Sequence, residues 1–127
     1  MPLTFCIIDD EREVCDVLRL YFEARGHRCV VAHDGPTGIE LIRRQKPAAV
    51  FLDLQMPKMN GYEVLQKLRA AEETKSIPVM LMTALTKESE RSDTDWAKAA
   101  GADAFLSKPF ELDDLLRVVE KLTGVKA

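Results

Sequence analysis

Reactive side chains recur at equivalent places along the chain, at or soon after the end of a short apolar segment. The set comprises three carboxylates, one hydroxyl and one ammonium group: Asp9, Asp10, Asp53, Thr83 and Lys108. Taken singly, each has an ordinary structural explanation, since an acid or a threonine often caps a helix and a lysine is often solvated. Chance would have to place complementary chemistry after four separate segments, so the set predicts a shared site.

Three carboxylates at one site would need a compensating charge. Two like charges about 4 Å apart repel by roughly 4 kcal/mol at an effective dielectric constant of about 20, so either one carboxylate is protonated or a cation lies between them. Oxygen ligands without histidine or cysteine suit a hard ion, and a few carboxylates that leave room for water and a phosphate favour Mg²⁺ over Ca²⁺. Lys108 would then pair with an anion that the metal also contacts, such as a phosphoryl group. An aspartate could accept that group as an aspartyl phosphate, and Thr83 could hydrogen-bond to it.

The hydrophobic pattern predicts the elements that position these residues. Five short apolar runs have the character of strands, at residues 3–8, 29–32, 48–52, 78–82 and 104–106. After each run comes a stretch with helical spacing. Four of these stretches carry apolar residues at positions 14–22, 39–42, 64–68 and 112–122, and a more polar helix is predicted at residues 88–100. Gly26 and Gly101 stand where the first and fourth of these helices would end.

The predicted strands are apolar throughout rather than alternating, which indicates burial on both faces. Parallel sheets covered by helices have this property, so five strand–helix repeats predict an open, doubly wound α/β fold. No linker or change of composition interrupts the chain, which predicts one domain over residues 1–127. In such folds ligands bind outside the carboxyl ends of the strands, where the reactive side chains would meet.

The overall composition excludes several classes of protein. The chain has 18 basic and 21 acidic residues and a net charge of −3, which argues against nucleic-acid binding by bulk electrostatics. With 46% hydrophobic and 31% charged residues, it has the balance of a soluble globular domain. Its apolar runs are too short to cross a membrane, and no secretory signal is present. We therefore expect a cytoplasmic protein without membrane or direct nucleic-acid contacts.

The cysteines and histidines are expected to have structural roles. Cys6, Cys15 and Cys29 lack metal-ligand spacing and are predicted to be small buried residues in a reducing compartment. His27 and His33 have no cysteine partner at ligand spacing, so a histidine metal site is not expected.

Four segments together resemble the receiver domain of two-component response regulators. They are residues 7–11 (IIDDE), 50–61 (VFLDLQMPKMNG), 78–84 (PVMLMTA) and 101–110 (GADAFLSKPF). The resemblance covers essentially the whole chain, with all motifs in order. It implies a flavodoxin-like α/β fold, with a five-stranded parallel sheet of strand order 2-1-3-4-5 between five helices.

The resemblance implies a role for each oxygen ligand at the site. Asp53 is similar to the phosphoacceptor of the family and would also bind Mg²⁺. Asp10 is similar to the acid that binds the metal directly, and Asp9 to the acid that acts mainly through a bound water. The backbone carbonyl of Gln55 matches a third protein ligand.

The resemblance also implies which residues hold the phosphoryl group and respond to it. Lys108 is similar to the lysine that pairs with phosphate, and it precedes Pro109, which in the family is typically cis. Thr83 is similar to the switch hydroxyl, and Phe105 falls where the family places an aromatic residue that turns inward on activation. The family more often has tyrosine at this position. Phenylalanine has no hydroxyl, so the switch at Phe105 would depend on packing alone. We expect Thr83 to move toward the phosphorylated Asp53 and the vacated space to admit Phe105.

The resemblance implies protein partners on both sides of the switch. A histidine kinase or phosphotransfer protein would donate the phosphoryl group, while this chain supplies positioning and electrostatics for transfer and later hydrolysis. The chain would be a phosphoacceptor signalling protein, not an enzyme. A downstream protein would bind the face built from the helix at 88–100, the strand at 104–106 and the final helix. We expect a monomer or a weak phosphorylation-dependent dimer, either as a stand-alone receiver or as a fragment of a longer regulator.

One segment departs from the family pattern. The stretch from Thr83 to Gly101 is three residues longer than expected, and the extra length falls around residues 86–95. These residues are polar on every side, which predicts a solvated loop and a slightly longer helix, with a modified output surface as the alternative. Trp96 is expected to be partly buried.

Two other functions are compatible with parts of the pattern. A phosphatase of the haloacid dehalogenase type also uses an aspartate nucleophile, Mg²⁺, a threonine and a lysine, but it needs a second acid where this chain has Gln55. A binding module that has lost phosphorylation would have no use for a convergent carboxylate cluster. Steady turnover of a small phosphomonoester would favour the phosphatase, whereas single-turnover labelling from acetyl phosphate would favour the receiver.

Overall fold

The computed structural model describes residues 2–56, 59–83, 101–108 and 110–126 of the chain. Within these residues the elements are β1 (Thr4–Ile8), α1 (Arg12–Ala24), β2 (Arg28–Ala32), α2 (Gly35–Gln45), β3 (Ala49–Asp53), α3 (Gly61–Ala70), β4 (Val79–Thr83), β5 (Ala104–Ser107) and α5 (Leu112–Thr123). The helix predicted at residues 88–100 lies outside the described residues, as do the predictions for residues 86–95, Trp96 and Pro109. None of the described helices is long and apolar enough to cross a membrane.

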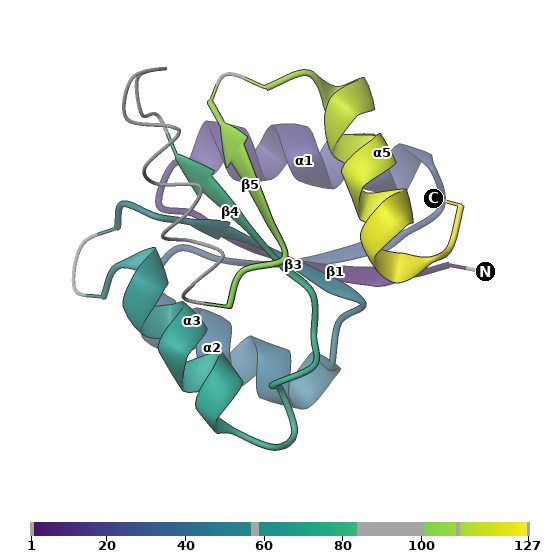
Figure 1. Ribbon diagram of the computed structural model, residues 1–127. Helices are drawn as coiled ribbons and strands as arrows, with labels where there is room; N and C mark the ends of the chain where they lie inside the picture. Colours follow the sequence, from purple (N-terminus) through teal and green to yellow (C-terminus); the bar gives the residue numbers. More distant parts are fainter. Residues whose placement is uncertain (1, 57–58, 84–100, 109, 127) are drawn as a thin grey trace.

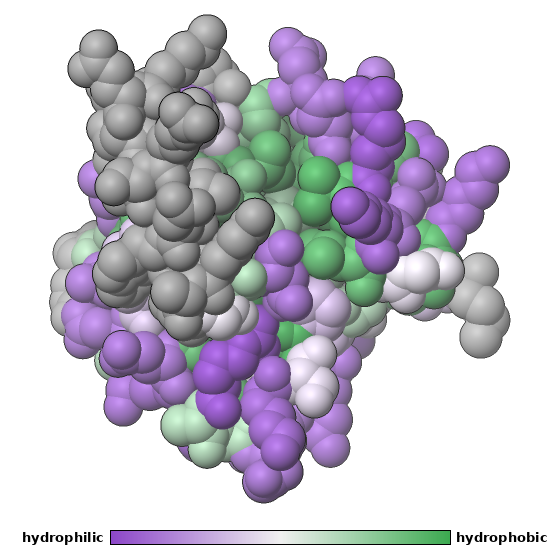
Figure 2. Space-filling view, viewed as in Figure 1, coloured by the Kyte–Doolittle hydropathy of each residue, from purple (hydrophilic) through white to green (hydrophobic). Residues whose placement is uncertain are grey.

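The strands form one parallel sheet in the order β2-β1-β3-β4-β5, which confirms the predicted flavodoxin-like topology. Helices α1 and α5 cover one face of the sheet, and α2 and α3 cover the other (Figure 1). Every residue of β3 and β4 is buried, whereas most residues of the edge strands β2 and β5 are half-buried. The surface seen in Figure 2 is mainly hydrophilic, with hydrophobic residues gathered beside α5. The burial of β3 and β4 confirms the prediction, made from the continuous apolar runs, that these strands are covered on both faces.

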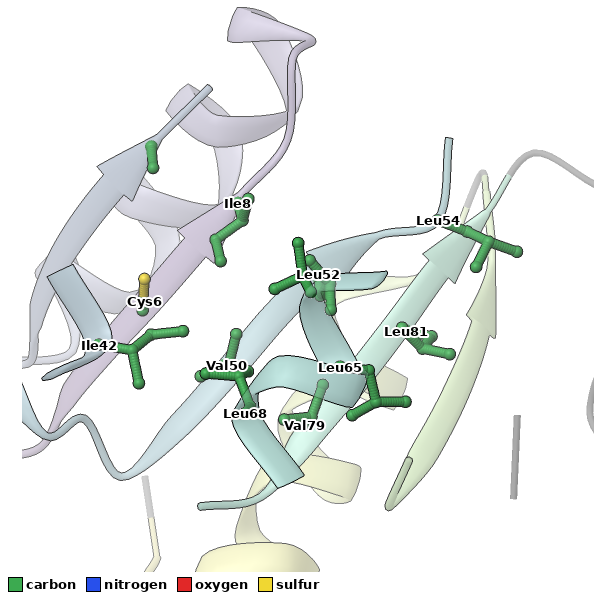
Figure 3. Close-up of a cluster of buried hydrophobic side chains, with 12 residues drawn as sticks. Cys6, Ile8, Ile42, Val50, Leu52, Leu54, Leu65, Leu68, Val79 and Leu81 are labelled. Atoms are coloured by element: carbon green, nitrogen blue, oxygen red, sulfur yellow. The ribbon is translucent and has the colours of Figure 1, made fainter. Parts of the chain in front are cut away.

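Alternate strand residues contribute to two hydrophobic cores, one on each face of the sheet. The core beneath α2 and α3 contains Cys6, Ile8, Val50, Leu52, Val79, Leu81, Ile42, Leu65 and Leu68 (Figure 3). On the opposite face Phe22 of α1 stacks on Phe51 of β3, with their ring centroids 5.4 Å apart. The two cores hold the strands firmly along their length, so their carboxyl ends form a fixed edge.

The three cysteines are free thiols. Cys6 and Cys15 are buried and Cys29 is half-buried. Burial raises the pKa of each thiol to about 12, so all three remain protonated. The predicted burial is confirmed for Cys6 and Cys15, whereas Cys29 is only partly covered.

Helices α2 and α3 begin at side-chain caps. At α2, Asp34 accepts a hydrogen bond at 2.8 Å from the backbone N–H three residues on. At α3, Asn60 and Glu63 form a reciprocal capping box. Gly61 opens α3 directly beside the carboxyl end of β3, and a Cβ at this position would lie 2.5 Å from the Asp53 carbonyl oxygen. Only glycine therefore allows α3 to begin this close to Asp53.

His27 is a buried residue beside the start of β1, with 8% of its surface exposed. Its Nδ1 accepts a hydrogen bond from the Leu3 N–H at 2.9 Å. The proton of the neutral ring is therefore on Nε2, which has no partner among the described residues. Burial lowers the pKa of His27, and the positive charges of the N-terminus and Arg25 lower it further.

We expect the His27→Asn variant to lose part of the pH dependence of stability. The folded residue titrates below the ordinary pKa of 6.5, so the unfolded chain takes up the proton first as the pH falls. The stabilisation from neutral His27 is complete above pH 6.5 and is lost as the pH falls through the native pKa. Asparagine keeps an acceptor for the Leu3 N–H but does not titrate. Urea unfolding from about pH 7.5 to about pH 5 should show a larger loss of unfolding free energy in the wild type. Equal losses would contradict the prediction.

Candidate functional site

The carboxylates of Asp9, Asp10 and Asp53 lie together at the carboxyl ends of β1 and β3. One oxygen from each residue lies within 4.8 Å of the other two. The two strands are neighbours in the sheet, with Ile8 paired to Leu52, so the residues that follow them meet at one edge. We call these three acids the acidic cluster. Its ligand atoms are all oxygens, the donor type that Mg²⁺ prefers.

Asp9 and Asp10 are adjacent in sequence but differ in environment. Asp9 is fully buried, and its Oδ1 accepts a hydrogen bond from the Glu11 N–H at 2.9 Å. Asp10 is exposed. Within the part of the chain that the structure describes, the Asp10 carboxylate has no hydrogen-bond or ion-pair partner. It is therefore free to contact an ion at the mouth of the cluster.

Lys108 supplies positive charge to the acidic cluster. Its Nζ lies 2.8 Å from Asp9 Oδ2, 3.0 Å from Glu11 Oε1 and 3.6 Å from Asp53 Oδ1. Its backbone N–H donates to the Thr83 carbonyl at 2.6 Å, which joins the end of β5 to the end of β4. Burial alone would lower the pKa of Lys108, but hydrogen bonds to Asp9 and Glu11 and the charge of Asp53 outweigh it and raise the pKa above its ordinary value. Lys108 is therefore a permanent cation.

Asp53 is an acid in a buried position, with 3% of its surface exposed. Its pKa is raised to about 7, because burial and then the Asp9 carboxylate disfavour its charge more than Lys108 and the Gln55 N–H favour it. That N–H donates to Asp53 Oδ1 at 3.3 Å, while the Gln55 residue itself is exposed. The one ammonium group does not balance the cluster, so a further cation nearby would stabilise the ionised form of Asp53.

Thr83 of β4 and Phe105 of β5 lie on the side of Asp53 that faces away from β1. Thr83 ends β4, whose neighbouring residue Met82 pairs with Asp53 in the sheet. It is fully buried, and its hydroxyl has no hydrogen-bond partner among the described residues. Phe105 pairs with Leu81 and packs, half-buried, against the core beneath α2 and α3. It therefore does not belong to the acidic cluster itself.

Three residues contact the site without having been predicted there. Glu11 forms an ion pair with Lys108. Its position in the sequence next to two site acids was the signal that could have placed it at the site. His33 Nδ1 lies 3.0 Å from the backbone oxygen of Asp9, and Cys15 Sγ lies 3.3 Å from the same atom. Contacts to a main-chain atom leave no signature in residue types or spacing, so the sequence offered no means of finding them.

A groove opens beside the acidic cluster, between α1 and the segment that leads from β5 into α5. It is lined by Glu11, Glu13, Val14, Val17, Leu18, Lys108 and Phe110. It continues along a second stretch lined by Val17, Tyr21, Phe110, Glu111, Leu112 and Asp113. Val17 lines both stretches and is 50% exposed. Because Glu11 and Lys108 belong to both the groove and the site, a molecule in the groove would reach the acidic cluster.

The sequence matches the family model of the response regulator receiver domain over residues 5–120. The response regulator MprA of Mycobacterium sp. (strain KMS) is 38% identical over 117 residues, which cover 91% of this chain and 48% of MprA. The chain thus spans about half the length of relatives of this kind.

Solved structures of receiver domains share the fold. The receiver domain of the Francisella response regulator 1452 is 27% identical with a TM-score of 0.84, over 96% of this chain and 97% of that one. The receiver domain of the sensor histidine kinase PA1611 from Pseudomonas aeruginosa PAO1 has a TM-score of 0.86 at 23% identity, over 98% of this chain and 100% of that one. That domain was crystallised with a magnesium ion coordinated in its active site cleft. At this identity the second similarity concerns the fold alone.

We expect the Asp53→Asn variant to be more stable than the wild type in metal-free buffer of about pH 8. The folded pKa of about 7 lies above the ordinary value of 3.8, so Asp53 stabilises the fold in its protonated form. This stabilisation is lost as the pH rises through about 7. An amide avoids the buried charge, so the free energy of unfolding should rise by about 2 kcal/mol.

Chemical denaturation in the presence of EDTA measures this difference, which should shrink toward about pH 4. Glu23→Gln, at an exposed position of α1, is the matched control and should change stability by less than about 0.5 kcal/mol. An Asp53→Asn variant that is less stable than the wild type at the higher pH would contradict the prediction.

Proposed function

The chain belongs to the response regulator receiver domain family, and we propose that it is a phosphorylation-activated switch whose phosphoacceptor is Asp53. The observation that carries this proposal is the clustering of the Asp9, Asp10 and Asp53 oxygens within 4.8 Å of one another, beside the Lys108 ammonium. The proposal treats the whole chain, residues 1–127, as one receiver domain.

The donor would be a phosphohistidine of a sensor histidine kinase or of a phosphotransfer protein. A carboxylate oxygen of Asp53 would form a bond to phosphorus while the bond from phosphorus to the histidine nitrogen breaks, and that nitrogen would keep the electron pair. Asp53 must be ionised to attack, so its pKa of about 7 makes nearby positive charge part of the chemistry. Lys108, 3.6 Å from the attacking carboxylate, would pair with the oxygens of the transferred group.

The acidic cluster fits Mg²⁺, because its donors are all oxygens and its charge is not balanced by Lys108. Asp10, Asp53 and the backbone carbonyl of Gln55 would hold the ion directly, and Asp9 would act through a bound water. The magnesium ion in the receiver domain of PA1611 supports this choice of metal. When bound, Mg²⁺ supplies positive charge that stabilises the phosphoryl oxygens during transfer.

Thr83 would detect the phosphorylated state. An unpaired buried hydroxyl costs about 1–3 kcal/mol, and the Thr83 hydroxyl has no partner among the described residues. A phosphoryl group on Asp53 would offer it new acceptor oxygens at the end of the neighbouring strand. Movement of Thr83 toward those oxygens would open space next to β5, into which the half-buried ring of Phe105 would turn.

The output surface would include β5 and α5, together with the predicted helix at residues 88–100, which lies outside the described residues. Figure 2 shows hydrophobic surface between β5 and α5 on the face that it presents. The half-buried apolar residues of these two elements include Ala104, Phe105, Leu106, Leu112, Leu116 and Val118. A downstream protein would bind here, with the chain acting as a monomer or as a weak phosphorylation-dependent dimer.

The phosphodonor protein would dock in the groove beside the acidic cluster. A helix seated between α1 and α5 would bring its phosphohistidine next to Asp53, because Lys108 both lines the groove and contacts Asp53. Val17 would supply an exposed apolar contact for such a helix. Docking at this surface would matter for a protein donor and not for a small phosphodonor.

As a phosphoacceptor the chain would promote its own phosphorylation and dephosphorylation rather than turn over a separate substrate. The haloacid dehalogenase-like phosphatase has no support among the similar proteins, and Gln55 stands where that mechanism needs an acid. A cytoplasmic location without direct nucleic-acid contacts, in keeping with the net charge of −3, is also part of the proposal.

Phosphorylation from acetyl phosphate is the direct test of Asp53. With Mg²⁺ present, intact-protein mass spectrometry should show one phosphoryl group on the wild type, none on Asp53→Ala, and none on the wild type in EDTA. Lys108→Ala should slow labelling by about a hundredfold, since it removes one electrostatic partner of the transferred group. Glu13→Ala, at an exposed acid outside the cluster, should label like the wild type. Undiminished labelling of Asp53→Ala would exclude Asp53 as the acceptor.

The groove leads to a separate prediction about the rate of transfer from a protein donor. We expect Val17→Lys to slow transfer from a cognate histidine kinase by about tenfold or more, because a charge replaces an apolar contact of about 1.4 kcal/mol or more. Labelling from acetyl phosphate should be unchanged, since this donor needs no docking surface. Leu20→Lys is the matched control, because Leu20 is 65% exposed on the same helix but does not line the groove. Equal effects of both substitutions on kinase transfer would refute the assignment.

A further inference from the structure

The backbone carbonyl of Asp9 accepts two side-chain hydrogen bonds from different elements. His33, just after β2, approaches it with Nδ1 at 3.0 Å, and Cys15 of α1 approaches it with Sγ at 3.3 Å. A carbonyl oxygen can only accept, so Nδ1 of His33 must carry a proton and donate it. The Asp9 N–H in turn donates to the Ala32 carbonyl at 3.1 Å. The main chain of Asp9 is therefore attached to the end of β2 on both sides of its α-carbon.

This attachment also fixes the residue that follows. The Asp9 carbonyl belongs to the planar peptide group that joins Asp9 to Asp10. Holding that oxygen stops the plane from rotating, and so sets the direction in which the Asp10 side chain leaves the backbone. The Asp10 carboxylate is exposed and has no hydrogen-bond or ion-pair partner within the described residues. Its position in the acidic cluster therefore depends on the backbone and not on contacts of its own.

We propose that His33 is a positioning residue, whose Nδ1–H bond to the Asp9 carbonyl directs the Asp10 carboxylate toward Asp53 and prepares the acidic cluster for a divalent cation. The inference rests on the proposed function, since it concerns the affinity of that same site for Mg²⁺. His33 would not touch the ion. Residues that orient metal ligands in this way affect affinity by about 10–100-fold when they are replaced.

His33 carries more of this role than Cys15 does. A ring N–H at 3.0 Å is a full-strength donor, whereas a thiol is a weak one. Cys15 is buried in the core and would pack in place even without its hydrogen bond. His33 is only half-buried, so its replacement removes the contact without opening a cavity in the core.

The test is a calorimetric titration of the metal-free proteins with MgCl₂. We expect His33→Leu to weaken Mg²⁺ binding by about tenfold. His33→Asn keeps an N–H donor near the position of Nδ1 and should remain within about threefold of the wild type. His27→Asn is the matched control, because it replaces the other histidine, which lies beside Leu3 at the opposite end of β1 from the acidic cluster, and it should bind Mg²⁺ like the wild type. His33→Phe is a second variant without a donor. Its ring has nearly the shape of the imidazole, so it serves as the test should His33→Leu not fold.

A second readout separates positioning from a general loss of structure. With acetyl phosphate, His33→Leu should need about tenfold more Mg²⁺ for half-maximal labelling but should reach nearly the wild-type rate at saturation. If both donor-free variants bind Mg²⁺ as the wild type does, or if His33→Asn is as impaired as they are, the inference is wrong while the proposed function stands. If the wild type itself binds no Mg²⁺, the proposed function fails, and this inference with it.

Discussion

The crowding of negative charge around Asp53 is the constraint on which the rest of the structure depends. Asp9, Asp10 and Asp53 place oxygens within 4.8 Å of one another, and the Lys108 ammonium divides its charge between Asp9, Asp53 and Glu11. Burial, and then the Asp9 carboxylate, raise the pKa of Asp53 to about 7 in spite of Lys108. An isolated loop could not hold such charges together, because it would move until they separated. The cluster exists because the fold fixes the positions of its three acids.

The fold supplies that rigidity through apolar burial on both faces of the sheet. Strands β3 and β4 are buried along their whole length, and β1 is buried except at its first residue. The carboxyl ends of these three strands carry Asp9, Asp53 and Thr83. Each position is therefore determined by residues deep in the two cores rather than by the polar residues at the edge. The site is a consequence of parallel strands that end in register.

The sequence predicted the parts of this arrangement that follow from strand order. Uninterrupted apolar runs indicated a buried parallel sheet, and such a sheet puts residues after β1 and β3 at one edge, so the meeting of Asp9 and Asp53 could be foreseen. The bond from His33 to the Asp9 carbonyl could not, because it joins a side chain to a main-chain oxygen 24 residues away. The contact of Glu11 with Lys108 had only one signal in the sequence, the position of Glu11 next to two site acids, and an exposed acid there is ordinarily solvated. Sequence patterns report which surfaces are buried, whereas these contacts depend on where individual atoms come to rest.

Gly61 makes the two sides of Asp53, the proposed phosphoacceptor, structurally different. The first turn of α3 abuts the Asp53 carbonyl so closely that not even a methyl group would fit between them. At this contact the backbone of Asp53 cannot move toward α3 without displacing the helix and its capping box. At the end of the neighbouring strand β4 lies the buried Thr83 hydroxyl, which has no hydrogen-bond partner among the described residues. Displacement of Asp53 is therefore resisted at α3, whereas the Thr83 hydroxyl could still gain a hydrogen bond, so in the proposed switch the response would be directed toward β4.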